Sequence, residues 1–428
     1  MAAIHEHHLS NGMTLLCFPQ EHLHSIHMGL YLKGGTLYEN RQNQGVTHLL
    51  EHLCFRGLGG LHHDALQQAL SRMGAELNGA TYAEAVVFDL SALPRFFESM
   101  TDLFLRFFAD VSWTQEQIDA EKQVVLRQIE EDECDFEEQI DRRYRRTAAG
   151  AFPRMGTAES IQEMSAATIR RWQRMIFQPL NACLCLTGAV SAAMEKAAVK
   201  AFSSLVNHTE EPPFVQAVPR DFCMRSPASD LILDEAGGHA KVHIAFDLDD
   251  EHVFPLLSEV VDAITGGSDD SLLFQELREH EALVAEIDST LEEMGLFRRL
   301  VIRYDVRQEC LAESLRKVFA LLNRLRMYIR PVRLELARLP FTENNEMMLD
   351  APAGMSELMG WAWLADDLSR ADLDAQAAMY DDLTTEDLLD AAQSIFRPEN
   401  LCVTIQRDPA LTPKNLKPLL LELRGMLA

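Results

Sequence analysis

Long hydrophobic runs are missing from this sequence. None of its segments approaches the roughly 18 consecutive apolar residues of a membrane-spanning helix, in a chain of 428 residues. The first residues, Met1 to His8, carry neither the basic segment nor the apolar core of a secretory signal. We therefore expect a cytoplasmic protein that has no membrane contact.

Positive charge is also scarce. The chain has 39 Lys and Arg against 66 Asp and Glu, which gives a net charge of −27. An acidic surface repels phosphate backbones, so nucleic acid is not an expected partner. The chain contains no P-loop, no G-x-G-x-x-G after a strand and no G-x-S-x-G, so nucleotide use and serine hydrolysis have no support. Basic or extended peptides suit the charge better.

Paired cysteine motifs are absent as well. Eight cysteines are scattered along the chain without a C-x-x-C. Cys183 and Cys185 are two apart in an apolar run, so a strand would point both to the same face. This usage is typical of small buried residues in a reducing compartment.

An internal repeat is the most useful feature that is present. Residues 176–187 (IFQPLNACLCLT) and 395–406 (IFRPENLCVTIQ) share five of twelve positions at an offset of 219. A helical pattern with a capping residue, Ser165 or Thr384, precedes each copy. We interpret the repeat as a duplication. Two unrelated helix–turn–strand units would give the same pattern.

The length suggests two or three domains, and 47% apolar with 25% charged residues is typical of a globular protein. The proline-containing stretch 211–222 is the expected linker between an αβ domain at 1–210 and a homologous one at 223–428. Strand patterns at 13–17 and 26–32 precede a helix from Gly45, and a strand pattern at 241–247 precedes a helix from Pro255. Strands and helices do not alternate regularly, so we expect an α+β fold with antiparallel or mixed sheets packed with helices.

The sharpest chemical signal is His48-Leu-Leu-Glu51-His52. Residues i and i+4 share a helix face, so both imidazoles can reach one ion. Glu51 can take a proton from water near that ion, as in the H-x-x-E-H zinc peptidases. The alternative is a pair of histidines on a surface helix. The leucines between them favour a buried face, where paired histidines need a partner.

The chain resembles the M16 zinc metallopeptidase family (pitrilysin, insulysin and mitochondrial processing peptidase). It resembles the small subunits of that family, in which two αβ domains form one bowl. The resemblance covers nearly the whole length. It rests on the H-x-x-E-H run and on these further segments: Asn11-Gly-Met, Gly34-Gly35, Phe55-Arg56-Gly57, Leu77 to Glu84, Glu121 to Arg127, Gly266-Gly267 and Leu273 to Glu279. It implies two αβ domains that form half of a clam-shell around an unfolded peptide.

The resemblance implies that His48 and His52 are zinc ligands and that Glu51 is the general base. Glu121 matches the family's outer glutamate, which supports a zinc ligand and does not itself bind the metal. Seven residues later the family has a third zinc ligand, a glutamate, where this chain has Gln128. A neutral amide is a weaker zinc ligand than a carboxylate. Glu131, one turn further on, is an alternative third ligand, and Glu130 is less well placed.

Substrate-binding positions also follow from the resemblance. Residues 78–84, with Asn78, Gly79 and Ala80, would form an exposed edge strand to which a peptide backbone adds. We expect this strand to continue into Val86, Val87 and Phe88. The alternative is an ordinary hairpin strand with no role in substrate binding. In the family, an Arg followed seven residues later by a Tyr holds the scissile carbonyl in the opposite bowl. This chain has Arg278 but Ala285, which points to a heterodimer with a second M16-like subunit that supplies the pair.

Two functions are therefore predicted. The first is a zinc-dependent endopeptidase subunit that hydrolyses extended peptides or leader segments, with basic peptides compatible with the charge. The second is a noncatalytic M16-like subunit that binds peptide or supports an active partner. The intact H-x-x-E-H favours the first function, whereas Gln128 and Ala285 favour the second.

Overall fold

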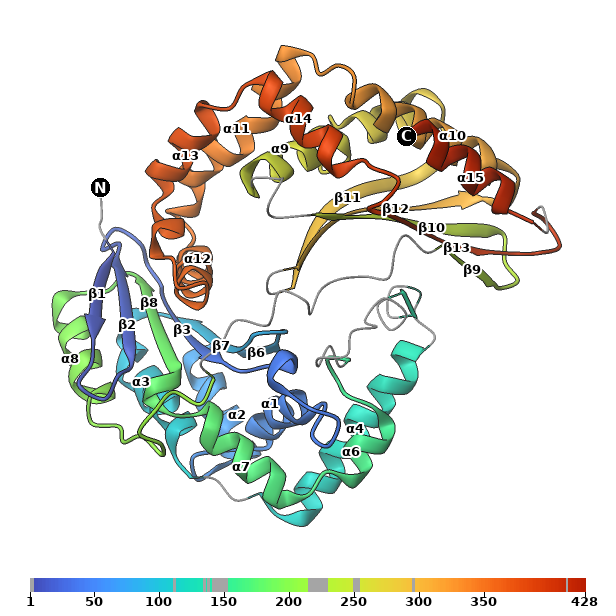
Figure 1. Cartoon of the computed structure of the whole chain (residues 1–428). Helices are drawn as coiled ribbons and strands as arrows, with labels where there is room; N and C mark the ends of the chain where they lie inside the picture. The colour runs from blue at the N-terminus through green and yellow to red at the C-terminus, as the bar shows by residue number, and fades with distance from the viewer. Residues whose placement is uncertain are drawn as a thin grey trace. The chain divides into compact units, whose positions relative to one another are not determined.

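The computed structural model describes residues 4–110, 113–133, 136, 139–140, 153–214, 230–248, 255–294, 297–412 and 415–428. The chain divides into two compact units. Unit 1 comprises Met1–Phe222 with Asn345–Leu373, and unit 2 comprises Cys223–Asn344 with Asp374–Ala428. Each unit packs helices against a mixed sheet, which confirms the predicted α+β class (Figure 1). None of the described helices is long and apolar enough to cross a membrane.

Unit 1 has a six-stranded sheet in the order β1-β2-β8-β3-β7-β6. Only β2 and β8 run parallel. The strands are β1 (His5–His8), β2 (Thr14–Pro19), β3 (Ile26–Lys33), β6 (Leu77–Thr81), β7 (Ala85–Ala92) and β8 (Ala182–Gly188), with a separate hairpin of β4 (Gly57–Leu58) and β5 (Leu61–His62). The helices are α1 (Val46–Arg56), α2 (His63–Met73), α3 (Phe97–Leu105), α4 (Gln115–Glu133), α6 (Ala158–Glu163), α7 (Ala166–Ile176), α8 (Ala192–Phe202) and α12 (Pro352–Leu364).

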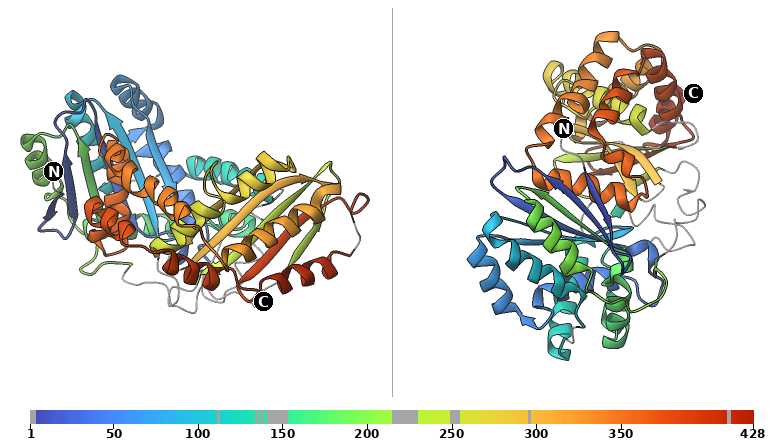
Figure 2. Two further views of the ribbon diagram at one scale, coloured as in Figure 1. Left: turned by 90° about the horizontal axis from the view of Figure 1, so that it is seen from above. Right: turned by 90° about the vertical axis from the view of Figure 1, so that its left-hand side faces the viewer.

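Unit 2 has a five-stranded sheet in the order β11-β12-β10-β13-β9. Its strands are β9 (Leu231–Asp234), β10 (His239–Leu248), β11 (Val284–Met294), β12 (Phe297–Arg307) and β13 (Leu401–Arg407). Its helices are α9 (Pro255–Thr265), the π-helix η6 (Phe274–His280), α10 (Leu311–Leu325), α11 (Pro331–Met348, whose last residues belong to unit 1), α13 (Leu373–Asp381), α14 (Thr385–Ile395) and α15 (Lys417–Met426). Figure 2 shows both sheets from two further directions.

The predicted duplication is visible in the pairing of the strands. The order β2-β8-β3-β7-β6 in unit 1 corresponds to β9-β13-β10-β12-β11 in unit 2, each with one parallel pair at the same place. The repeated sequences also make the same local bonds. Ser165 and Thr384 cap their helices through the backbone N–H three residues on. Asn181 and Asn400 each donate from the side-chain amide to the carbonyl of the isoleucine five residues earlier.

One segment of the second half belongs to the first unit. Alternate residues of β8 face opposite sides of the sheet, so Cys183 and Cys185 share one face, as predicted. That face is apolar and packs against Met355 and Met359 of α12. The predicted division into 1–210, 211–222 and 223–428 places α12 in the C-terminal domain, whereas in the structure it belongs to unit 1. The apolar pattern of α12 does not indicate which sheet it covers. Residues 215–222 of the expected linker lie outside the described residues.

Candidate functional site

Helix α1 carries the histidine pair and begins in an unusual way. Its N-cap, Gly45, has a left-handed backbone (φ 83°), and an added Cβ would lie 2.4 Å from the carbonyl oxygen of Met155. A glycine N-cap has no side chain to accept the free N–H groups of the first turn. Glu39 does this instead, accepting from the backbone N–H of Gly45 at 2.7 Å and of Thr47 at 2.9 Å. Burial raises the pKa of Glu39 to about 7, although these bonds oppose the shift.

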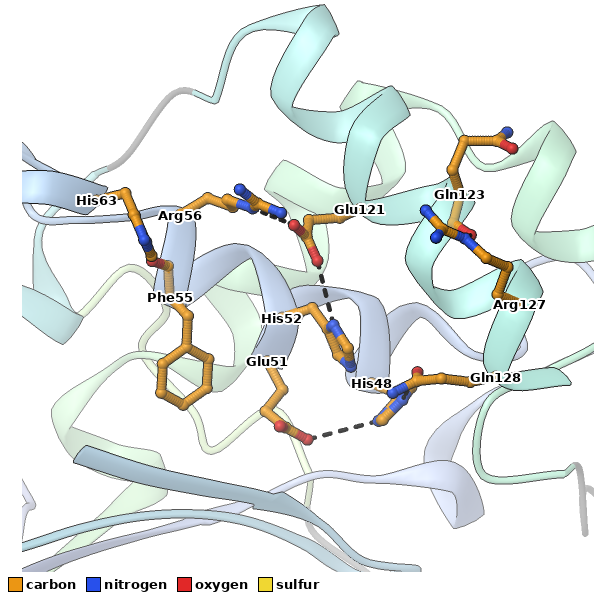
Figure 3. Close-up of polar contacts among 10 residues, drawn as sticks. All are labelled: His48, Glu51, His52, Phe55, Arg56, His63, Glu121, Gln123, Arg127 and Gln128. Carbon is orange, nitrogen blue, oxygen red and sulfur yellow. Dashed lines mark hydrogen bonds and ion pairs between the residues drawn. The ribbon is translucent and has the colours of Figure 1, made fainter. Parts of the chain in front are cut away.

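The two histidines face the same way from α1, as their spacing predicts (Figure 3). Their ring centroids are 4.6 Å apart, and His48 is only 8% exposed. Leu49, Leu50 and Leu53 of the same helix are buried in the core of unit 1. The helix is therefore anchored by its leucines and presents its imidazoles at the edge of that core.

Helix α4 provides the residues opposite the pair. Glu121 and Gln128 are seven residues apart, which is two helical turns, so they share a face. Glu121 Oε2 accepts a hydrogen bond from His52 Nδ1 at 3.1 Å, and Arg56 pairs with the other carboxylate oxygen. Burial opposes the ionisation of Glu121, but the hydrogen bonds from His52 and Arg56 outweigh it and lower its pKa. A carboxylate that binds Nδ1–H fixes the ring so that Nε2 carries the free lone pair, which is the form that binds a metal.

Gln128 lies next to His48. The distance between Gln128 Oε1 and His48 Nε2 is 3.2 Å, and the side chain of Gln128 is partly buried. Glu130 and Glu131, the other acidic residues considered for the third ligand, are exposed. The geometry thus favours the amide oxygen of Gln128 over Glu131 as the third donor beside the histidines.

Glu51 lies between the histidines and the edge of the sheet. Its Oε2 accepts from Thr81 Oγ1 at 2.7 Å and is 3.5 Å from His48 Nδ1. Burial raises the pKa of Glu51, but the opposing contacts with His48 and Thr81 give a net lowering. Sequence reasoning missed Thr81. The sequence places it in the Leu77 to Glu84 segment, but no local pattern indicates its contact with a residue 30 positions earlier.

Strand β6 is the edge strand of its sheet, as predicted for Asn78, Gly79 and Ala80. It ends at Thr81, and Val86, Val87 and Phe88 belong to the next strand, β7. The single strand expected to run from Asn78 through Phe88 is therefore wrong, because the chain turns at residues 82–84. A Cβ on Gly79 would lie 2.9 Å from the ring of Phe55, so glycine lets β6 approach α1.

Arg278 belongs to η6 of unit 2 and is not in the same unit as Glu51. Its guanidinium lies 4.6 Å from the ring centroid of Phe274, and its Nε is 3.9 Å from Glu279. Ala285 is exposed on β11. The structure therefore unites His48, Glu51, His52, Glu121 and Gln128 in unit 1, whereas Arg278 belongs to unit 2.

The second copy of the fold lacks the polar site. Helix α9 follows β10 as α1 follows β3, and both helices have eleven residues. Counted from the helix start, the positions of His48, Glu51 and His52 are taken by Leu257, Val260 and Val261. The second helix is therefore apolar at the three positions that carry the histidines and the glutamate in the first.

A zinc ion suits part of this donor set. Among the described residues, no three His, Cys, Asp or Glu side chains are placed together to hold a metal. Two imidazoles and one amide oxygen are present, and zinc sites accept histidine nitrogen readily but are usually completed by a charged ligand. His48 Nδ1 is buried without a hydrogen bond in the described part of the chain. These residues therefore fit a zinc ion held by two strong ligands, the imidazoles, and one weak ligand, the amide oxygen of Gln128.

Comparison with known families identifies the family of the chain. Residues 19–157 match the family described as "Insulinase (Peptidase family M16)", and residues 163–339 match "Peptidase M16 inactive domain". The chain belongs to peptidase family M16. The first match contains the whole histidine site, and the second includes the apolar helix α9.

Individual M16 relatives are distant in sequence. An uncharacterized zinc protease of Rickettsia bellii is 23% identical over 374 residues, covering 82% of this chain and 85% of that protein. The mitochondrial-processing peptidase subunit beta of Caenorhabditis elegans is 25% identical, covering 48% of this chain and 46% of that protein. A protease from Helicobacter pylori has the same fold, with a TM-score of 0.83, 18% identity, and coverage of 95% of this chain and 100% of that one.

Proposed function

We propose that this chain is a zinc-dependent endopeptidase subunit that hydrolyses extended peptides or leader segments. The observation that carries the proposal is the arrangement around α1. His52 is oriented by Glu121, His48 lies against Gln128, and Glu51 is held by Thr81 beside the ring of His48. Zinc would be held by His48, His52 and the amide oxygen of Gln128. When bound there, it would polarise a water molecule and the scissile carbonyl.

The chain's own residues would handle the proton. The lowered pKa of Glu51 favours its carboxylate form, which would accept a proton from water at Oε1 or Oε2 and pass it to the leaving amine. The hydroxyl of Thr81 donates to Oε2 and limits the rotation of the carboxylate. Arg56 holds Glu121 and thereby the ring of His52. None of these roles needs a residue of unit 2.

Strand β6 is the proposed binding place for the substrate backbone. It ends the sheet of unit 1, so one row of its backbone groups is available for an added strand. The contact between Thr81 and Glu51 brings that edge to the site. Such binding selects extended peptides, and the net charge of −27 is compatible with basic ones.

A second M16-like subunit is the proposed partner, and a heterodimer is favoured over a homodimer. Ala285 has no side chain that could stabilise an oxyanion, so a partner that supplies an Arg and Tyr pair would complete the chemistry. One relative is by name a subunit, the mitochondrial-processing peptidase subunit beta. We also propose a cytoplasmic location, because scattered cysteines without a C-x-x-C are typical of a reducing compartment.

Cleavage of a peptide library tests the proposal. The chain would be assayed alone and with a homologous partner, with added zinc. We expect Glu51→Gln to abolish cleavage, because the amide cannot accept the proton. The matched exchange Glu130→Gln, on the exposed face of α4, should leave cleavage unchanged. Cleavage that persists in Glu51→Gln would assign the activity to the partner.

A noncatalytic subunit is the second candidate, and it is favoured by Gln128 and Ala285. In that case the chain binds extended peptides along β6 without cutting them. Peptide binding that is retained, with no cleavage under any combination of zinc and partner, would establish this candidate and exclude the first.

A further inference from the structure

Unit 2 contains a pocket that the proposed peptidase chemistry does not use. It has a volume of about 260 Å³ and lies where the ends of α9 and α10 meet the start of α11. Its apolar lining includes Ile264, Leu325 and Ile329, all of which are buried. Its polar lining consists largely of arginines: Arg324, Arg330 and Arg333.

Two of these arginines have no partner among the described residues. The guanidiniums of Arg324 and Arg330 make no hydrogen bond or ion pair with any residue that the structure describes, and both side chains are exposed. Arg333 differs, because its Nη1 donates to the backbone and carboxylate oxygens of Asp270 at 2.6 and 3.0 Å. The net positive charge at the pocket therefore comes from Arg324 and Arg330.

The charge at the pocket is positive, opposite in sign to the net charge of the whole chain. Residues 324–333 (RLRMYIRPVR) contain four arginines and no acidic residue, in a protein of net charge −27. The pocket also adjoins the first turn of α11, an 18-residue helix. Such a turn carries the positive end of the helix dipole. Like-charged side chains and a helix N-terminus beside one cavity form an environment that favours an anion.

The shape and lining define the ligand further. A guanidinium binds two oxygens of a phosphate or a carboxylate in parallel. The buried aliphatic residues below the arginines favour an apolar group on the same molecule, and Tyr328, 61% exposed, adds an aromatic ring to the lining. We propose that this pocket binds a small organic anion, with a phosphate or carboxylate head at Arg324 and Arg330 and an apolar body against Ile264, Leu325 and Ile329.

Titration of the full chain with phenyl phosphate tests this proposal. Zinc would be removed first with a chelator, so that the anion cannot bind at the histidine site. Ligand-detected NMR should give a dissociation constant of about 1 mM or tighter for a ligand of this size. Arg324→Gln and Arg330→Gln should each weaken binding about five- to tenfold. Phenylacetate tests the carboxylate head, and saturable binding of either ligand supports the proposal.

A matched control is available on the same helix. Arg316 of α10 is exposed like Arg324 but is paired with Glu422 at 2.8 Å, so Arg316→Gln should leave binding unchanged. Equal losses in Arg316→Gln and Arg324→Gln would overturn the site, as would no saturable binding of either ligand. Inorganic phosphate that binds as tightly as phenyl phosphate would overturn the role of the apolar lining. Unchanged melting temperatures show that the exposed substitutions leave the fold intact.

Discussion

Replacing Gln128 by glutamate should tighten zinc binding by about ten- to a hundredfold. The substitution keeps the length of the side chain and adds a charge where Oε1 now lies 3.2 Å from His48 Nε2. The attraction between a divalent ion and a carboxylate oxygen about 2 Å away is about 4 kcal/mol even at the dielectric constant of water. Partial desolvation of the new carboxylate offsets about 1–2.5 kcal/mol of this. The net gain is about 1.5–3 kcal/mol, which corresponds to that affinity change.

Competition with a chromophoric chelator would measure the zinc affinity of the metal-free chain and its variants. Gln123→Glu is the matched control, because Gln123 lies on the same helix, is exposed, and points away from the histidines in Figure 3. An equal rise in zinc affinity in both variants would mean that added negative charge anywhere on α4 tightens zinc binding, and that residue 128 has no special position. No rise in Gln128→Glu, together with a loss in Glu131→Gln, would refute the ligand assignment in favour of Glu131.

Three further predictions concern the surroundings of the site and the packing of α12. Thr81→Val should reduce cleavage about tenfold and raise the pKa of Glu51 in the pH–rate profile, because a hydrogen bond to a buried carboxylate is lost. Gly360→Ala should lower stability by about 1–3 kcal/mol in thermal unfolding, because its Cβ would lie 2.2 Å from the ring of Tyr31. Burial raises the pKa of Glu39 from 4.5 to about 7, and this shift should stabilise the fold by about 3 kcal/mol below about pH 4.5. That stability should be lost as the pH rises through 7.

Each of these predictions has a control. Thr101→Val removes a hydroxyl that bonds within α3, so cleavage should be retained. Gly354→Ala, on the same helix as Gly360, meets nothing closer than 3.5 Å and should be neutral or slightly stabilising. Glu39→Gln should remove the pH-dependent loss, whereas the exposed Glu98→Gln should keep it. A Thr81→Val enzyme with full activity, or equal pH profiles for wild type and Glu39→Gln, would show that the roles assigned to Thr81 and Glu39 are wrong.

Features that depend on local spacing were predictable from the sequence. His48 and His52 share a face because of the helical period, and the same period places Glu121 and Gln128 on one face of α4. The repeat around Asn181 and Asn400 predicted equivalent turns, because the same residue types make the same short-range hydrogen bonds.

Features that depend on long-range packing were not predictable. The contact of Thr81 with Glu51 requires the register of β6 against α1, which no local pattern defines. The turn at residues 82–84 interrupts a run that also suits one long strand. Helix α12 is apolar enough to pack against either sheet, and its place is decided by contacts such as that of Gly360 with Tyr31.

Zinc content is the most direct test of the proposed centre. The full chain would be purified without chelators, equilibrated with zinc, and analysed for bound metal beside His52→Ala. We expect close to one zinc per wild-type chain and none in the variant, with both chains folded. A well-folded wild-type chain that takes up no zinc would show that the proposed centre is wrong.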